Sequence, residues 1–73
     1  MKIKVETYSG YKADERPTVF YIGNRKHRIV EVTDRWYDPS ADYFKVKAED
    51  GGVYILVRNR EGDFWELRGF FRE

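Results

Sequence analysis

Short runs of alternating apolar and polar residues cover most of this chain. Ile3 and Val5 lie two positions apart, as do Phe44 and Val46. That spacing places side chains on one face of a β-strand. No run shows the 3.6-residue period of an amphipathic helix, so the pattern predicts strands and no helix. The six predicted strands cover residues 2–8, 18–22, 27–36, 43–49, 53–58 and 64–68.

Turn residues separate these runs and indicate how the strands connect. Gly23-Asn24 and Asp50-Gly51-Gly52 supply the positive φ angles that tight hairpins need. Consecutive hairpins give an antiparallel meander, and a flat six-stranded sheet would leave two open edges. We therefore expect one all-β domain over residues 1–73, a small meander curled into a barrel of about six strands. Within the third strand, Val30 and Val32 are predicted to face the same way.

Aromatic residues make up 18% of the 73 residues, and there is no cysteine. A domain this small buries only about 60% of its unfolded surface, so large rings must supply much of the core. Trp36 and Phe44 are accordingly predicted to be structural. Gly69-Phe70-Phe71 is expected to pack under the barrel, which favours a monomer, and a weak dimer through the C-terminal strand is the alternative.

The longest apolar run, residues 53–57, is far too short to span a membrane. The N-terminal residues alternate like a strand and lack the apolar core of a signal peptide. The sequence therefore predicts a soluble, cytoplasmic protein with no membrane partner.

Residues for enzymatic chemistry are sparse. His27 is the only histidine and lies between Lys26 and Arg28, which predicts an exposed turn residue rather than a metal ligand. Ser9 and Ser40 lie in turn-like segments without a nucleophile motif. The carboxylate pairs have plainer roles in turns. We expect no metal, no cofactor and no enzymatic activity.

The leading hypothesis is an interaction module that binds a protein partner. Two polar, aromatic-rich loops, before the second strand and after the third, would supply the binding face. Its candidate residues are Tyr11, Lys12, Arg16, Tyr37, Asp38 and Asp42.

Single-stranded nucleic acid is the alternative ligand, because small barrels bind it with exposed aromatic rings beside a basic groove. The candidate residues are Tyr43, Lys45, Lys47, Tyr54, Arg58 and Arg60. A net charge of +1 gives no strong field for steering nucleic acid, which favours the protein partner. The one basic cluster, Arg25, Lys26 and Arg28, is interpreted as a solvated hairpin tip.

Segments of the chain resemble two groups of known proteins. The segments 8–17 (YSGYKADERP), 34–39 (DRWYDP) and 42–46 (DYFKV) resemble a family of small uncharacterised bacterial proteins, which implies a compact β domain. Residues 35 to about 71, with RWYDP at 35–39, Asp50-Gly51 and GDFWE at 62–66, resemble the C-terminal tail of the polymerase-like subunit of a bacterial mutagenic repair complex. The second resemblance implies an association with DNA repair and transfers no catalytic residue.

Overall fold

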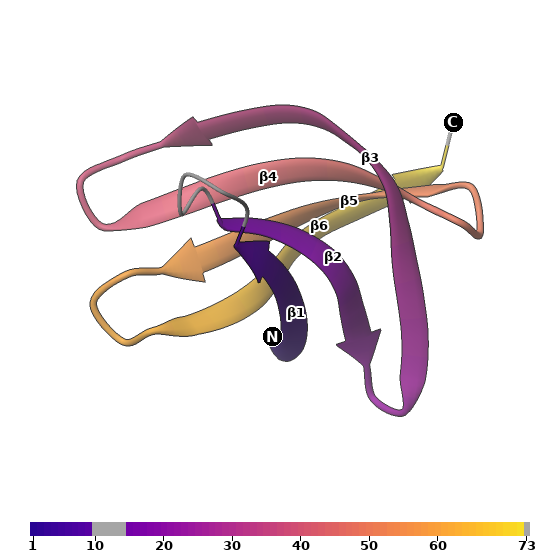
Figure 1. Ribbon diagram of the computed structural model, residues 1–73, viewed down its shortest axis with the longest axis horizontal. Coiled ribbons are helices and arrows are strands. Elements are labelled where there is room, and N and C mark those ends of the chain that lie inside the picture. The colour runs from indigo at the N-terminus through magenta and orange to yellow at the C-terminus, as the bar shows by residue number, and fades with distance from the viewer. Residues whose placement is uncertain (10–14, 73) are drawn as a thin grey trace.

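A computed structural model describes residues 1–9 and 15–72 of the protein. The described residues form six antiparallel strands in meander order that close into a barrel, as Figure 1 shows. The predicted fold class is therefore confirmed. The strands are β1 (Lys2–Ser9), β2 (Glu15–Ile22), β3 (Arg25–Tyr37), β4 (Ala41–Ala48), β5 (Gly52–Asn59) and β6 (Phe64–Arg72).

The strands differ from the prediction mainly at their ends. β2 begins at Glu15, within the segment predicted to be a polar loop, and β6 continues to Arg72. The predicted hairpin glycines are confirmed, because Gly23 has φ 60° and Gly51 has φ 86°. These are left-handed conformations that residues with a Cβ rarely adopt.

The barrel wall is uneven. β4 pairs with β5 along nearly its whole length, from Ala41↔Asn59 to Lys47↔Val53, and β5 pairs with β6 from Gly52↔Arg72 to Asn59↔Phe64. The β2–β3 ladder covers only Val19–Ile22 against Arg25–Arg28. Among the described residues, β1 and β6 close the barrel through Lys2↔Glu66 and Ile3↔Trp65.

Apolar side chains from alternate positions of every strand fill the interior. Figure 1 shows the strands curling around this space. Partly buried residues such as Ile3, Val32 and Trp65 pack around its centre. The central cluster consists of Phe20, Phe44, Val46, Ala48, Tyr54 and Leu56.

Two bulges in β3 change which of its residues face inward. The register shifts between Ile29 and Glu31, and again between Val32 and Asp34. Each bulge adds one unpaired residue and reverses the alternation beyond it. Ile29 and Val32 therefore pack on the core, while Val30 is 57% exposed. The prediction that Val30 and Val32 face the same way is wrong.

The large rings divide between the two sides of the wall. Phe44 is buried, as predicted, but Trp36 lies outside the barrel, 41% exposed and stacked on Tyr43 at 5.5 Å. Phe70 and Phe71 extend β6 and remain about half exposed, so they are not packed under the barrel as predicted. Phe70 still touches the core, with its ring centroid 4.8 Å from that of Tyr54.

Candidate functional site

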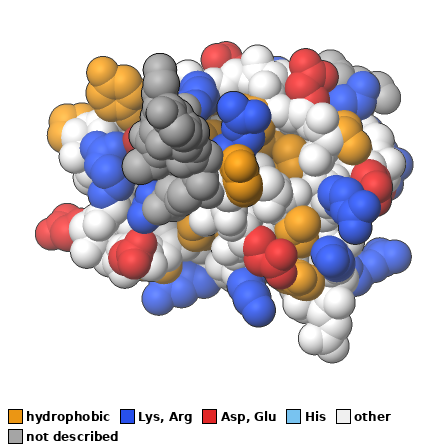
Figure 2. All heavy atoms as spheres, viewed as in Figure 1, with side chains coloured by type: hydrophobic (Ala, Val, Ile, Leu, Met, Phe, Trp, Pro, Cys, Tyr) orange, Lys and Arg blue, Asp and Glu red, His pale blue; other side chains and the backbone are white. Residues whose placement is uncertain are grey.

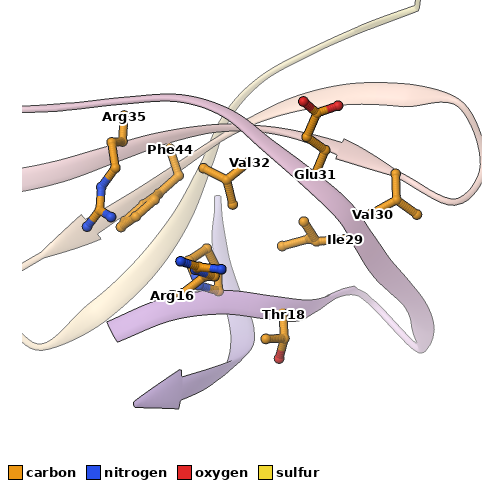
Figure 3. Close-up of a pocket in the computed structure, with 9 residues that line it drawn as sticks. Arg16, Thr18, Ile29, Val30, Glu31, Val32, Arg35 and Phe44 are labelled. Carbon is orange, nitrogen blue, oxygen red and sulfur yellow. The ribbon is translucent and has the colours of Figure 1, made fainter. Parts of the chain in front are cut away.

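A cleft opens where the β2–β3 ladder ends. Beyond the Val19↔Arg28 pair, β3 continues along β4 while β2 continues along β1, and the two strands separate. The space between them has a volume of about 500 Å³ and leads down to the core (Figure 3). Its lining residues are Arg16, Pro17, Thr18, Ile29, Val30, Glu31, Val32, Arg35 and Phe44.

Local sequence explains why the ladder ends here. Pro17 has no backbone N–H to donate across the seam, and it is buried. On the facing strand, Val30 is an extra residue in the β3–β4 ladder, and such a bulge bends its strand. The β2–β3 ladder therefore ends where β2 has a proline and β3 bends.

The cleft has an apolar floor with positive charge beside it. Phe44 and Val32 form part of the floor, and the Arg35 guanidinium carbon lies 5.3 Å from the Phe44 ring centroid. Arg16 reaches into the same space from β2, whereas the Glu31 carboxylate points away from it (Figure 3). An apolar group next to a carboxylate would complement this combination.

The predicted protein-binding face is only partly assembled among the described residues. Tyr11 and Lys12 lie outside them. Arg16 lines the cleft, and Tyr37, at the end of β3, is 79% exposed. Asp38 and Asp42 are held in contacts of their own at the β3–β4 corner.

Asp38 organises that corner. Its Oδ1 accepts hydrogen bonds from the backbone N–H groups of Ser40 (2.9 Å) and Ala41 (2.8 Å), and its Oδ2 accepts one from the Tyr43 hydroxyl (2.8 Å). The Tyr43 hydroxyl and these amide donors lower the pKa of Asp38 below its ordinary value. The same bond raises the pKa of Tyr43. Asp38 is therefore a structural residue first.

The predicted nucleic-acid face is divided by the barrel wall. Tyr43, Lys45 and Lys47 lie on the outer side of β4, opposite the buried Phe44 and Val46.

Tyr54 is 3% exposed and belongs to the core, so it lies on the inner side. Arg58 follows the same inward alternation as Leu56, and its Nη2 lies 3.3 Å from Asp63 Oδ1. Arg60 is engaged at the corner, with its Nη1 2.6 Å from Asp42 Oδ1. These six residues therefore do not form one surface.

Acidic neighbours also neutralise the outer row of β4. Lys45 pairs in register with Asp34, and Lys47 pairs with Glu31. Opposite charges directly across two strands cancel much of the field that a phosphate would feel. This region of the wall offers aromatic rings without a net basic charge.

His27 is not the exposed turn residue that was predicted. Its side chain is 13% exposed and stacks on Phe20 at 4.9 Å, and its Nδ1 lies 3.5 Å from Asp50 Oδ2. Because Phe20 faces the core, its register partner His27 faces the core as well.

Asp50 connects the turn between β4 and β5 to the core residue Tyr54 through its hydrogen bonds. It accepts hydrogen bonds from the Gly52 N–H (2.8 Å) and the Tyr54 hydroxyl (2.7 Å), and these bonds lower its pKa. Burial and the bond to Asp50 raise the pKa of Tyr54 to about 12.

Among the described residues, no three His, Asp or Glu side chains are grouped to hold a metal ion. None of the described chain forms a helix long and apolar enough to cross a membrane.

Sequence reasoning missed the cleft as a whole. Of its lining residues only Arg16 was a candidate, because the others come from a seam whose opening depends on pairing between distant segments. The available local signal was Pro17, which marks a position where a ladder cannot continue.

Comparison with known proteins finds no family model, no curated protein and no solved structure that matches this chain. The two resemblances drawn from the sequence stay predictions.

Proposed function

We propose that this protein is a non-enzymatic interaction module that holds an extended segment of a partner protein in the β2–β3 cleft. The observation that carries the proposal is the early end of the β2–β3 ladder, which leaves an opening down to Phe44. Everywhere else in the meander, neighbouring strands pair over most of their length.

The size and lining of the cleft suit side-chain recognition. A volume of about 500 Å³ lies within the usual range of ligand sites. Phe44 and Val32 can contact one large apolar side chain of the partner, and aromatic rings in such contacts prefer offset or edge-on packing. Arg16, at the edge, can bind a carboxylate on a neighbouring residue.

The backbone contributes less to this recognition. Pro17 and the β3 bulges are features that natural sheets use to prevent further strand pairing. We therefore expect the partner segment to be read through its side chains rather than added as a seventh strand. Its chemistry would be one aromatic residue next to acidic residues.

The experiment is an NMR titration of the ¹⁵N-labelled protein with a short peptide containing one phenylalanine flanked by aspartates. A second peptide carries lysines in place of the aspartates. We expect the aspartate peptide to shift the amide signals of residues 16–18 and 29–35, and the lysine peptide to leave them unchanged.

Charge reversal at the cleft provides the matched control. Arg16→Glu should weaken binding of the aspartate peptide about tenfold, which corresponds to the loss of roughly 1.4 kcal/mol. Arg68→Glu makes the same charge change on β6, outside the cleft, and should leave the affinity within about twofold. Equal losses in both variants, or unmoved cleft signals at saturating peptide, would rule out this binding site.

A further inference from the structure

A row of basic residues lies on the outer face of β1 and β3, on both sides of the paired part of β2 that leads from the hairpin to the cleft. The register places Lys4 beside Tyr21, and Tyr21 beside Lys26. Two residues further along, at the next position on the same face, Val19 lies beside Arg28. Lys2 occupies the next outward position of β1. We call Lys2, Lys4, Lys26 and Arg28 the basic row.

The part of this face beside Lys2 and Lys4 is concave. A groove of about 600 Å³ is lined by Lys2, Ile3, Lys4, Tyr21, Gly23 and Asn24. The Tyr21 ring is fixed at its side, because its hydroxyl donates a 2.7 Å hydrogen bond to Glu6 Oε2 and Lys4 Nζ lies 5.4 Å from its centroid. Figure 2 shows Lys and Arg side chains gathered around the β2–β3 hairpin, at the lower right.

The charge of this face is unbalanced, unlike that of the β4 outer row. Within the β1–β2 pairs from Lys4 to Glu6 and the four β2–β3 pairs, Glu6 is the one outward-facing carboxylate among the described residues, and it accepts the hydrogen bond of the Tyr21 hydroxyl. Glu49, directly after β4, borders Arg28, and its backbone N–H donates to the Arg28 carbonyl. Glu66 of β6 lies opposite Lys2 at the margin. The paired part of this face therefore holds more cations than carboxylates, in a chain whose net charge is only +1. The sequence could not show this row, because only strand pairing brings Lys4 and Lys26 to the two sides of Tyr21.

We propose that the basic row binds the phosphate backbone of a nucleic acid. We favour a nucleic acid over a protein partner because this face offers no exposed apolar anchor among its described residues. A protein partner needs an apolar anchor to desolvate, but Val19 is already buried at 8% exposure and the Tyr21 hydroxyl is engaged. Lysines act as point charges toward phosphates, and affinity at such a face comes from released counterions. This site is independent of the cleft.

The test is fluorescence anisotropy with labelled oligo(dT) at low salt, using two variants of equal charge. Lys4→Glu/Lys26→Glu should weaken binding at least about tenfold, whereas Lys45→Glu/Lys47→Glu should change it by less than about threefold. If all four cations engage phosphates, a fourfold increase in salt should weaken wild-type binding about fiftyfold. Circular dichroism confirms that both variants remain folded.

Three outcomes of the binding experiment would each overturn the proposal. No binding at low salt removes the site, and a loss confined to Lys45→Glu/Lys47→Glu moves it to the β4 face. Polyglutamate of equal charge binding as tightly as oligo(dT) would make the row a general polyanion surface. If Lys4→Glu/Lys26→Glu unfolds, NMR shifts of the wild-type protein with oligo(dT) locate the binding site instead. Shifts centred on residues 2–4 and 26–28 support the row, and shifts elsewhere contradict it.

Discussion

The β4–β5–β6 wall and the β2–β3 seam are made from the same kind of alternating strand, yet one is closed and the other opens. In the closed wall every residue of β4 from Ala41 to Lys47 has a partner on β5. At the seam, pairing ends at Val19↔Arg28, where Pro17 and the bulge at Val30 follow. The comparison associates the open seam with a proline on one strand and a bulge on the other, in strands that otherwise alternate like those of the closed wall.

Core truncation should give the largest contrast between the two regions. Leu56 is 0% exposed beneath the closed wall, so Leu56→Ala should lower the free energy of unfolding by about 2–5 kcal/mol. Val30→Ala, at the cleft edge, should lower it by less than about 0.5 kcal/mol because that side chain is mostly in water. Urea unfolding measures both. Equal losses would mean that the open seam is as tightly packed as the wall.

Trp36 tests the outer side of the closed wall. Trp36→Ala removes a partly exposed ring stacked on Tyr43, and aromatic pairs contribute about 0.5–1.5 kcal/mol beyond their buried area. Because the ring is also more than half buried, we expect a total loss of about 2–3 kcal/mol in the same urea experiment, below that of a fully buried tryptophan. A loss above about 3 kcal/mol would show that this ring is core, as its size first suggested.

Acid should destabilise the closed wall through Asp38 and Asp50, which lie in the turns before and after β4. Hydrogen bonds lower the pKa of Asp38 and of Asp50 in the folded protein. Their stabilising effect is therefore present above the ordinary carboxyl pKa, about 4, and is lost as the pH falls through the lowered folded values. The urea midpoint should decrease below about pH 4.

The double variant Asp38→Asn/Asp50→Asn isolates these two groups. It should be less stable near neutral pH and show a flatter decrease in acid. A wild-type midpoint that stays constant down to about pH 2, or an unchanged slope in the variant, would contradict the role given to these carboxylates.

The sequence predicts the features that depend on neighbouring residues. The strands, the glycine turns and the inward Phe44 and Val46 all follow from local spacing. His27 and Tyr54 were misplaced because their inward direction is set by register with Phe20 and by alternation along β5.

Pairing between segments also explains what was missed at the two candidate sites. The cleft depends on where one ladder stops, and the basic row depends on which strands lie side by side. Neither is encoded in a contiguous motif, so only the register of the sheet brings Lys4 and Lys26 to the two sides of Tyr21.

The closure of the barrel has a consequence for the order of folding. Every ladder except β1–β6 joins strands that are adjacent in sequence, so hairpins can form with short loops. Bringing Ile3 to Trp65 closes a loop of most of the chain, which costs about 1–2 kcal/mol more entropy than a ten-residue hairpin. Contacts of such long range form late when they bring few interactions. We therefore expect the meander to assemble as a curved sheet first, and the barrel to be completed when its two ends meet.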